Sequence, residues 1–369
     1  MELTFFESLS IANLEKIHSQ MISWIFNQTI FDNSQKTNIL NKLFILNENN
    51  LSDFKSYTEY NSIDIVIVTN KNLYIFENKL KSSQHSDQLN SYKGKIESDK
   101  NFRHTQSKYY GFLTLVGEES QNKDWINITY RDLYISLIEV FKFQKNNHTP
   151  SEIILNEYIK TLGNLITVLE KFDNDHKSFP NVFTDAGRKK FIKLNQNYPT
   201  NEQEYISKGN LETIFQEQFL RKISKKLNLT GYSYHIGNTK GKALIHVDLK
   251  KIKINGFDFS LGFQYQDNTL KFNIGAERYK HSLPNWLLPE VYAYMEALVE
   301  STEFVRFNPP KYRAYASVSK KIKNIHEMEI EDFISEFNKG FTLCIDLAKD
   351  FEIKWKNQSW DIVRTNVTS

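Results

Sequence analysis

Two apolar stretches that carry three charged residues constrain this chain more than any other feature. Residues 63–68 read IDIVIV, and residues 73–80 read LYIFENKL after a short turn. Short runs rich in β-branched and aromatic residues, bounded by turn residues, are typical of buried strands. A charged side chain in a buried strand costs free energy unless it is paired or bound to a metal. The presence of Asp64, Glu77 and Lys79 in these runs therefore points to chemistry.

The turn between the two runs predicts which residues face one another. Thr69-Asn70-Lys71-Asn72 suits a tight reversal, and Asn70 and Lys71 as the loop residues place Asp64 opposite Glu77. Opposed residues have Cβ atoms about 4.5–5.5 Å apart. Lys79 follows Glu77 by two residues, so it shares the same face of the strand. We therefore expect the three charges to cluster on one face of a sheet that is buried on both sides.

This cluster indicates a metal-dependent reaction on a phosphodiester. Two carboxylates at such a separation repel one another unless a cation lies between them. Sites built from oxygen ligands suit Mg²⁺ or Mn²⁺. Such an ion polarises a phosphoryl oxygen and lowers the pKa of a bound water. A neighbouring lysine can orient that water or stabilise developing negative charge. A cross-strand ion pair on an edge hairpin is the simpler alternative.

Asp64 followed by Glu77-Asn78-Lys79 resembles the core motif of the PD-(D/E)XK nuclease superfamily, which has the restriction-endonuclease-like fold. Gln88 and Tyr92, one helical turn apart, resemble the Q-x-x-x-Y element that follows this core in several branches. The resemblance covers roughly residues 10–145.

A helix before the core extends the resemblance to one bacterial, stand-alone branch. The run from Glu15 through His18 and Ser19 to Trp24 resembles the E-x-x-H-S…W element of that branch, and Glu59 also fits it. The resemblance implies metal ligation by Asp64, Glu77 and Glu15. It also implies a catalytic role for Lys79 and for Gln88, which would contact the substrate or the water shell of the metal. Three residues are accessory candidates: His18, Glu59 and Tyr92.

The pattern of elements in the first 145 residues predicts an α/β (α+β) domain with a mixed sheet flanked by helices. We expect helices over about 8–27, 35–46, 85–99 and 131–143. We expect strands over 54–60, 63–68, 73–80, 109–116 and 125–129. This part, residues 1–145, would be the nuclease core.

The remainder of the chain reads as a helical connector, 146–230, and a strand-rich α+β region, 231–369. A linker or loop at 144–151 stands at the start of the connector, and predicted helices cover 151–172, 184–195 and 201–228. Predicted strands cover 232–236, 243–254, 257–265 and 270–276, and predicted helices cover 288–300 and 330–348. We expect this last region to recognise substrate, bind a partner or form a dimer.

Composition bounds the class of protein. The chain has 369 residues, 40% of them hydrophobic and 25% charged, which is typical of a soluble globular protein. The net charge of +3 neither demands nor excludes a nucleic-acid partner. A single cysteine, Cys344, excludes an internal disulfide and a zinc site built from cysteines. The sequence shows no signal peptide and no apolar run near the roughly 20 residues that span a membrane, so we expect a cytoplasmic location without membrane contact.

Other charged clusters are weaker candidates. Asp248-Leu249-Lys250 lacks an acid on the preceding strand, and Glu97-Ser98-Asp99-Lys100 lies on a predicted helix, so both are interpreted as solvated surface. The basic runs Arg188-Lys189-Lys190 and Lys320-Lys321-Ile322-Lys323 are interpreted as solvated faces that could also contact DNA phosphates.

The sequence thus favours a Mg²⁺- or Mn²⁺-dependent endodeoxyribonuclease acting on DNA, with a role in defence against foreign DNA by analogy of fold. One alternative is a catalytically inactive nuclease-like module that senses a nucleic acid or a phage protein. Another is a subunit of a larger complex with a degenerate site. A homo-oligomer or a defence-system partner would be compatible with each of these.

Overall fold

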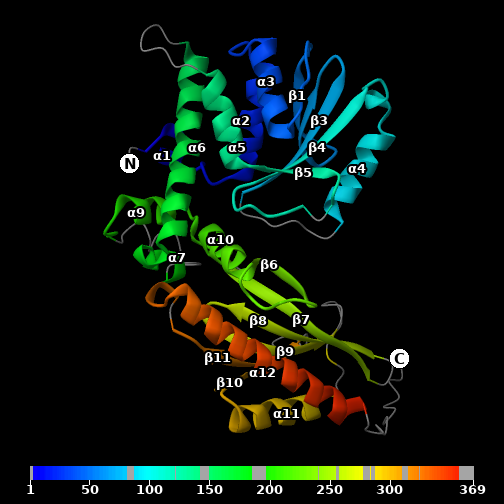
Figure 1. Ribbon diagram of the computed structural model, residues 1–369, viewed down its shortest axis with the longest axis vertical. Helices are drawn as coiled ribbons and strands as arrows, with labels where there is room; N and C mark the ends of the chain where they lie inside the picture. The colour runs from blue at the N-terminus through cyan, green and yellow to red at the C-terminus, as the bar shows by residue number, and fades with distance from the viewer. Residues whose placement is uncertain are drawn as a thin grey trace, which may run out of the picture. The chain divides into compact units, whose positions relative to one another are not determined.

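The computed structural model describes residues 3–80, 87–120, 122–141, 149–184, 197–239, 241–254, 257–276, 283, 287–309, 315–323 and 325–356. The chain forms two compact units, Met1–Gln218 and Phe219–Ser369 (Figure 1). The division into 1–145, 146–230 and 231–369 stays a prediction.

The first unit contains a five-stranded mixed sheet in the order β1-β2-β3-β4-β5. Strands β1 to β3 are antiparallel, and β3, β4 and β5 are parallel. The strands are β1 (Lys55–Tyr60), β2 (Ile63–Val68), β3 (Asn72–Lys79), β4 (Ser107–Thr114) and β5 (Trp125–Thr129). The helices around this sheet are α2 (Glu15–Asn27), α3 (Asn33–Phe44), α4 (Gln88–Ser98) and α5 (Tyr130–Val140), with a 3₁₀ turn at Lys100–Phe102. The predicted mixed sheet flanked by helices is confirmed.

The hairpin of β2 and β3 has the predicted register. Val68 pairs with Leu73 and Ile65 pairs with Phe76, so the next step along the ladder brings Asp64 opposite Glu77. Every residue of β3 is buried. On one face Val66 and Ile75 join a core cluster with α4 through Leu89 and Ile96, among others. On the other face the Phe44 ring of α3 contacts the Phe76 ring, with 5.0 Å between centroids. The strand is therefore covered on both sides, as its apolar pattern predicts.

The first unit also contains a helical part that follows the sheet. Its helices are α6 (Pro150–Asn174), α7 (Pro180–Thr184) and α9 (Asn201–Lys208), with a 3₁₀ turn at His176–Ser178. Helix α1 (Phe5–Ser8) precedes the sheet, and α10 (Glu212–Ser224) begins in this unit and ends in the second. Thr149 caps α6 and Pro150 occupies its first turn, where a missing N–H is tolerated. Residues 185–195 of the helix predicted over 184–195 lie outside the described residues.

The prediction of one helix over 201–228 is wrong. Helix α9 ends at Lys208 and is capped by Gly209, and Asn210 adopts a left-handed conformation with φ of 53° before α10 begins at Glu212. Glycine and asparagine tolerate such conformations better than other residues, which explains the break. The two helices therefore have separate dipoles.

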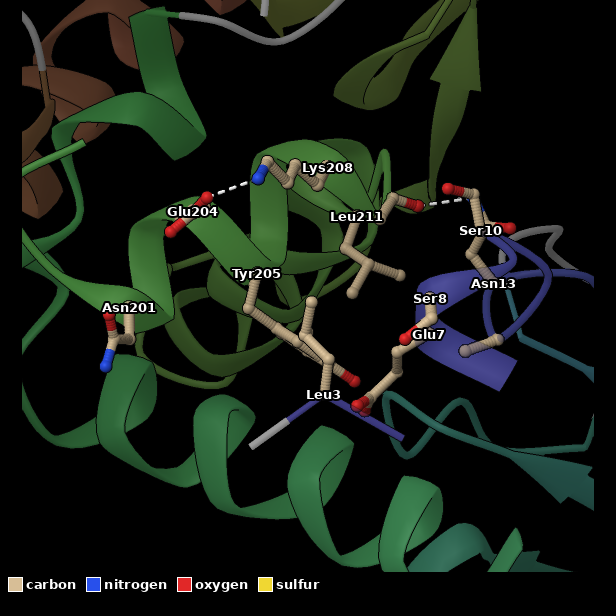
Figure 2. A pocket seen from close by; sticks show the side chains of 12 residues that line it. Leu3, Glu7, Ser8, Ser10, Asn13, Asn201, Glu204, Tyr205, Lys208 and Leu211 are labelled. Atoms are coloured by element: carbon tan, nitrogen blue, oxygen red, sulfur yellow. Dashed lines mark hydrogen bonds and ion pairs between the residues drawn. The ribbon is translucent and has the colours of Figure 1, made fainter. Parts of the chain in front are cut away.

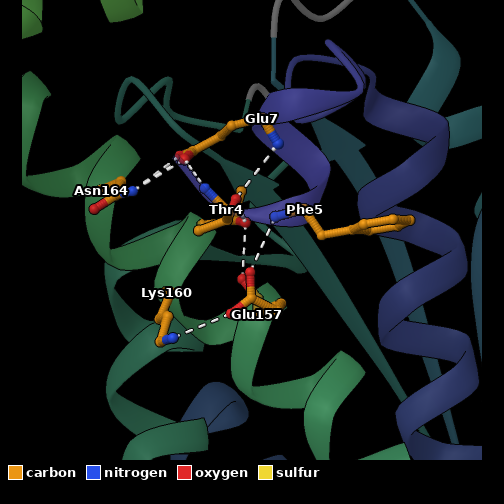
Figure 3. A network of polar contacts seen from close by, with 7 residues as sticks. Thr4, Phe5, Glu7, Glu157, Lys160 and Asn164 are labelled. Atoms are coloured by element: carbon orange, nitrogen blue, oxygen red, sulfur yellow. Dashed lines mark hydrogen bonds and ion pairs between the residues drawn. The ribbon is translucent and has the colours of Figure 1, made fainter. Parts of the chain in front are cut away.

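A polar network fixes the start of the chain to α6 (Figure 3). The carboxylate of Glu157 accepts a hydrogen bond from the backbone N–H of Phe5 at 3.0 Å. The amide of Asn164 donates to Glu7, and the Thr4 and Thr161 hydroxyls lie 2.6 Å apart. Because these bonds join residues about 150 positions apart, they hold α1 on the side of α6.

The second unit contains a six-stranded antiparallel sheet in the order β10-β11-β9-β8-β7-β6. Its strands are β6 (Ser233–Thr239), β7 (Lys242–Ile254), β8 (Phe257–Gln266), β9 (Thr269–Ala276), β10 (Arg306–Asn308) and β11 (Tyr315–Lys321). Its helices are α11 (Leu288–Ser301) and α12 (Ile330–Lys356), with a 3₁₀ turn at Ile325–Glu327. Strands β10 and β11 were not predicted, and β11 includes Lys320 and Lys321 of a predicted surface run. No helix among the described residues is long and apolar enough to cross a membrane.

Gly111 tests the packing of the first sheet. A Cβ there would lie 2.7 Å from Ile128 Cδ1 and 3.0 Å from the Phe44 ring. We expect Gly111→Ala to lower the free energy of unfolding by about 1–3 kcal/mol through overpacking. Gly94→Ala on α4 is the matched control, because no atom lies within 4 Å of its added Cβ. Denaturant unfolding of both variants measures the difference, and equal stability of the two would contradict this account of the core.

Candidate active site

The end of the β2–β3 hairpin brings Asp64, Glu77 and Lys79 together. The ammonium of Lys79 lies 2.6 Å from Glu77 Oε1. Asp64 Oδ2 accepts a hydrogen bond of 2.8 Å from the backbone N–H of Asn78, which lies between the other two. Glu77 is fully buried and Lys79 is 9% exposed. Three charged groups therefore share one mostly buried position in the sheet.

Burial and mutual repulsion perturb the acids of this cluster. Burial, and then the neighbouring Asp64, raise the pKa of Glu77 to about 8. Burial also raises the pKa of Asp64, against the opposing effect of the Asn78 amide. Burial alone would lower the pKa of Lys79, but the attraction of Glu77, Asp64 and Glu15 outweighs it and raises that pKa. Near neutral pH the pair of carboxyl groups thus favours retaining a proton, which a bound cation would replace.

Helix α4 supplies Gln88 and Tyr92 to the same cluster. The Gln88 amide nitrogen donates to Glu77 Oε1 at 2.8 Å and to the Tyr92 hydroxyl at 2.6 Å. Both residues belong to the first turns of α4, and Tyr92 is buried. The two sides of the Q-x-x-x-Y spacing therefore meet because residues four apart lie on one face of a helix.

Asn78 faces away from the cluster and fastens β3 to its neighbours. Its amide nitrogen donates to the Glu15 carbonyl and to the Ser19 hydroxyl, each at 3.0 Å. Its amide oxygen accepts from the Tyr130 hydroxyl of α5 at 2.8 Å. Sequence reasoning assigned no role to Asn78, although a buried polar residue between two charged ones is a detectable signal.

Glu15 lies beside the cluster but performs a backbone role. Its Oε1 accepts a hydrogen bond of 2.9 Å from the N–H of Leu80, directly after Lys79. Its charge also contributes to the pKa shifts of Asp64 and Lys79. The first turn of α2 therefore holds the end of β3 through both the side chain and the carbonyl of one residue.

His18 is packed behind the cluster. Its Nε2 lies 2.8 Å from the Ala12 carbonyl, so this nitrogen carries the proton, and its Nδ1 lies 3.2 Å from the Tyr158 hydroxyl. Its ring meets Tyr130 edge-on with centroids 5.1 Å apart. Burial lowers the pKa of His18 to about 4, so it is a neutral core residue at physiological pH. The same helix that carries Glu15 is thereby locked to α5 and α6.

Glu59 forms an ion pair with Lys16 and not with a residue of the cluster. It is on β1 with φ of 56°, and its exposed carboxylate pairs with the exposed Lys16 at 3.0 Å. The structure therefore brings together Asp64, Glu77, Lys79, Gln88 and Tyr92, with Glu15 and His18 in support.

The residues present fit a divalent cation held mainly by two carboxylates. Two acceptor oxygens, Glu77 Oε2 and Gln88 Oε1, are buried without a hydrogen-bond partner among the described residues. A cation would satisfy such oxygens, and Mg²⁺ is commonly bound by one or two carboxylates together with waters. Within the described part of the chain, no three His, Cys, Asp or Glu side chains gather as a ligand cluster. Ligation of a metal by Glu15 together with Asp64 and Glu77 stays a prediction.

A cavity of about 400 Å³ lies elsewhere in the first unit, between the start of the chain and α9 (Figure 2). Its walls include Glu7, Asn13, Tyr205 and Leu211. None of the predicted site residues lines this cavity, so it is separate from the carboxylate cluster.

A mixed sheet that carries two acids and a lysine at the end of a buried hairpin agrees with the resemblance that the sequence shows. Comparison with protein families agrees, because residues 3–160 match the model of the PD-(D/E)XK nuclease superfamily. The predicted resemblance to the superfamily is confirmed over these residues, and the assignment to a branch with an E-x-x-H-S helix stays a prediction. No curated protein and no solved structure matched the chain.

His18 predicts how stability depends on pH. The unfolded chain binds a proton at this residue near the ordinary pKa of 6.5, whereas the folded protein binds it only near 4. Stability therefore falls as the pH falls between these values, by up to about 3 kcal/mol from this residue. We expect His18→Gln to reduce this acid dependence in thermal unfolding measured from pH 7 to pH 4. The exposed His104→Gln should leave the dependence as in the wild type, and an unchanged dependence in His18→Gln would overturn the assignment.

Proposed function

We propose that this protein is a divalent-metal-dependent nuclease that hydrolyses phosphodiester bonds in DNA. The single observation that carries the proposal is the buried cluster of Asp64, Glu77 and Lys79, inside a domain of a nuclease superfamily. Buried charges with strongly perturbed pKa values gather at functional sites more often than elsewhere.

The proposed roles follow from the contacts. Asp64 and Glu77 would hold Mg²⁺ or Mn²⁺, since Glu77 retains an unpartnered buried oxygen. When bound, such an ion supplies a polarised phosphoryl oxygen and a more acidic water. Gln88 orients Glu77 by donating to one of its oxygens, and Tyr92 orients Gln88. Glu15 would act as a positioning residue, because it holds the backbone next to Lys79.

Lys79 would stabilise the charge that develops during hydrolysis. The oxygen of a water forms a bond to phosphorus and gives up a proton, the P–O ester bond breaks, and the leaving oxygen takes up a proton from solvent, while negative charge grows on the phosphoryl oxygens in the transition state. The Lys79 ammonium stays protonated because its pKa is raised, and the carboxylate of Glu77 holds it at the cluster. A fixed cation in a mostly buried position stabilises such charge more strongly than a solvated one.

Cleavage of plasmid DNA tests the roles. With Mg²⁺, we expect Asp64→Ala, Glu77→Ala and Lys79→Ala each to reduce the cleavage rate at least about 100-fold, a loss typical of removing a group that stabilises the transition state. Glu97→Gln on the exposed side of α4 is the charge-matched control and should cut like the wild type. Equal cutting by wild type and the three site variants would refute the assignment of these residues.

Metal binding separates the enzyme from an inactive nuclease-like sensor. Titration calorimetry with Mn²⁺ should show a site whose affinity falls at least about tenfold in Asp64→Ala, because a carboxylate ligand is lost. Glu97→Gln should retain the wild-type affinity. Absence of both metal binding and cleavage of DNA or RNA would favour the sensor. A role against foreign DNA extends the proposal, and a phage-challenge assay with the Lys79→Ala variant tests it.

A further inference from the structure

The sheet of the second unit has one apolar and one polar face. On the apolar face, the Phe263 ring contacts Phe337 of α12 with centroids 4.9 Å apart, and the Phe307 ring contacts Tyr292 of α11 at 5.4 Å. Both helices therefore pack on the side to which Phe263 and Phe307 point. The opposite side carries the alternate residues of the same strands.

One row of the polar face crosses all six strands without an acid. The strand register aligns its members, one from each of β10, β11, β9, β8, β7 and β6. We call the following residues the basic row: Arg306, Ser319, Lys271, Gln264, His246 and His235. Neighbouring strands lie about 4.8 Å apart, so the row is roughly 24 Å long.

Lys271 stands near the middle of the basic row without a carboxylate partner. Its ammonium contacts only amide oxygens, those of Gln264 and Gln266, each at 3.3 Å. The Asp267 carboxylate attracts it from beyond ion-pair distance and is itself paired with Lys242. Burial lowers the pKa of Lys271, which shows that its charge is poorly solvated. A partly buried cation paired with neutral groups is destabilising, and an incoming anion would offset this.

Gly262, which has no side chain, leaves space above the backbone in the middle of this face. A Cβ on Gly262 would lie 2.6 Å from the His246 ring and 2.8 Å from Asn273 Oδ1. The two polar side chains therefore lean over the backbone of β8, and His246 Nδ1 is buried without a hydrogen-bond partner. The row beside the basic row contains one acid, Asp248, whose carboxylate is 3.5 Å from His246. The centre of the face thus offers donors and cations on a flat floor.

We propose that the basic row of the second unit binds the sugar-phosphate backbone of a nucleic acid. The proposal rests on the proposed function for the identity of the ligand, and it adds a binding surface outside the nuclease domain. Charge complementarity favours this ligand, because Arg306 and Lys271 are joined by Lys321 two residues along β11 from Ser319. An ordinary solvated sheet face mixes charges of both signs, whereas the basic row holds cations and neutral donors only.

Binding of labelled 20-nucleotide DNA, single- and double-stranded, to the full chain in EDTA tests the surface apart from cleavage. We expect Lys271→Gln/Arg306→Gln to weaken binding at least about tenfold at low salt. The slope of log affinity against log salt should fall by about 1.4–1.8, since two phosphate contacts are lost. The matched control is Lys339→Gln/Lys349→Gln, which removes two exposed charges from α12 and should bind like the wild type.

A second double variant and a competition experiment test the same surface. If Lys271→Gln impairs folding, Arg306→Gln/Lys321→Gln replaces it, because both of those side chains belong to exposed residues. Wild-type affinity in either folded double variant, or equal loss in the control, would overturn the surface. Competition by polyglutamate as strong as by DNA would assign it to an acidic peptide and overturn it as well. If the wild type cleaves DNA and the double variants bind DNA as tightly as the wild type, the nuclease proposal stands and the binding surface is refuted. If the double variants bind DNA more weakly and the wild type cleaves no DNA, only the binding surface stands.

Discussion

The burial of strand β3 on both faces is the constraint on which the candidate site depends. An apolar strand covered by α4 on one side and by α3 on the other excludes water from its end. Little solvent reaches Glu77 and Lys79, so the protonation state of each depends on the other and on Asp64. In water the same three groups would interact weakly. Burial in the sheet thus makes this cluster of two carboxyl groups a position that favours a bound cation.

A second set of hydrogen bonds supports this position from behind. Asn78, which alternates with Glu77 and Lys79, joins β3 to α2 and to α5. Glu15 holds the next backbone amide, and His18 fixes the same helix to α6 through Tyr158. The E-x-x-H-S element therefore fastens α2 to the end of β3 and to α6, and these contacts account for the burial of its histidine.

The two sheets of the protein differ in how their faces are covered. In the mixed sheet of the first unit, β3 is buried along its whole length and carries the candidate site at its end, whereas the edge strand β1 alternates between exposed and buried residues. The antiparallel sheet of the second unit has helices on one face, and on its polar face the Lys271 ammonium is bonded to amide oxygens. A parallel arrangement requires helices on both faces, whereas an antiparallel sheet tolerates solvent on one. Strand topology thus leads to a compact site in one unit and an extended surface in the other.

The sequence by itself determined the mixed sheet, the hairpin register and the cluster of Asp64, Glu77 and Lys79, because alternation, turn residues and buried charge are local signals. Only the tertiary structure decided that His18 is a neutral core residue and that Glu15 binds a backbone amide, since both depend on partners distant in the chain. The basic row was likewise beyond the sequence. Its members lie on six strands between residues 233 and 321, and only strand pairing brings them into line.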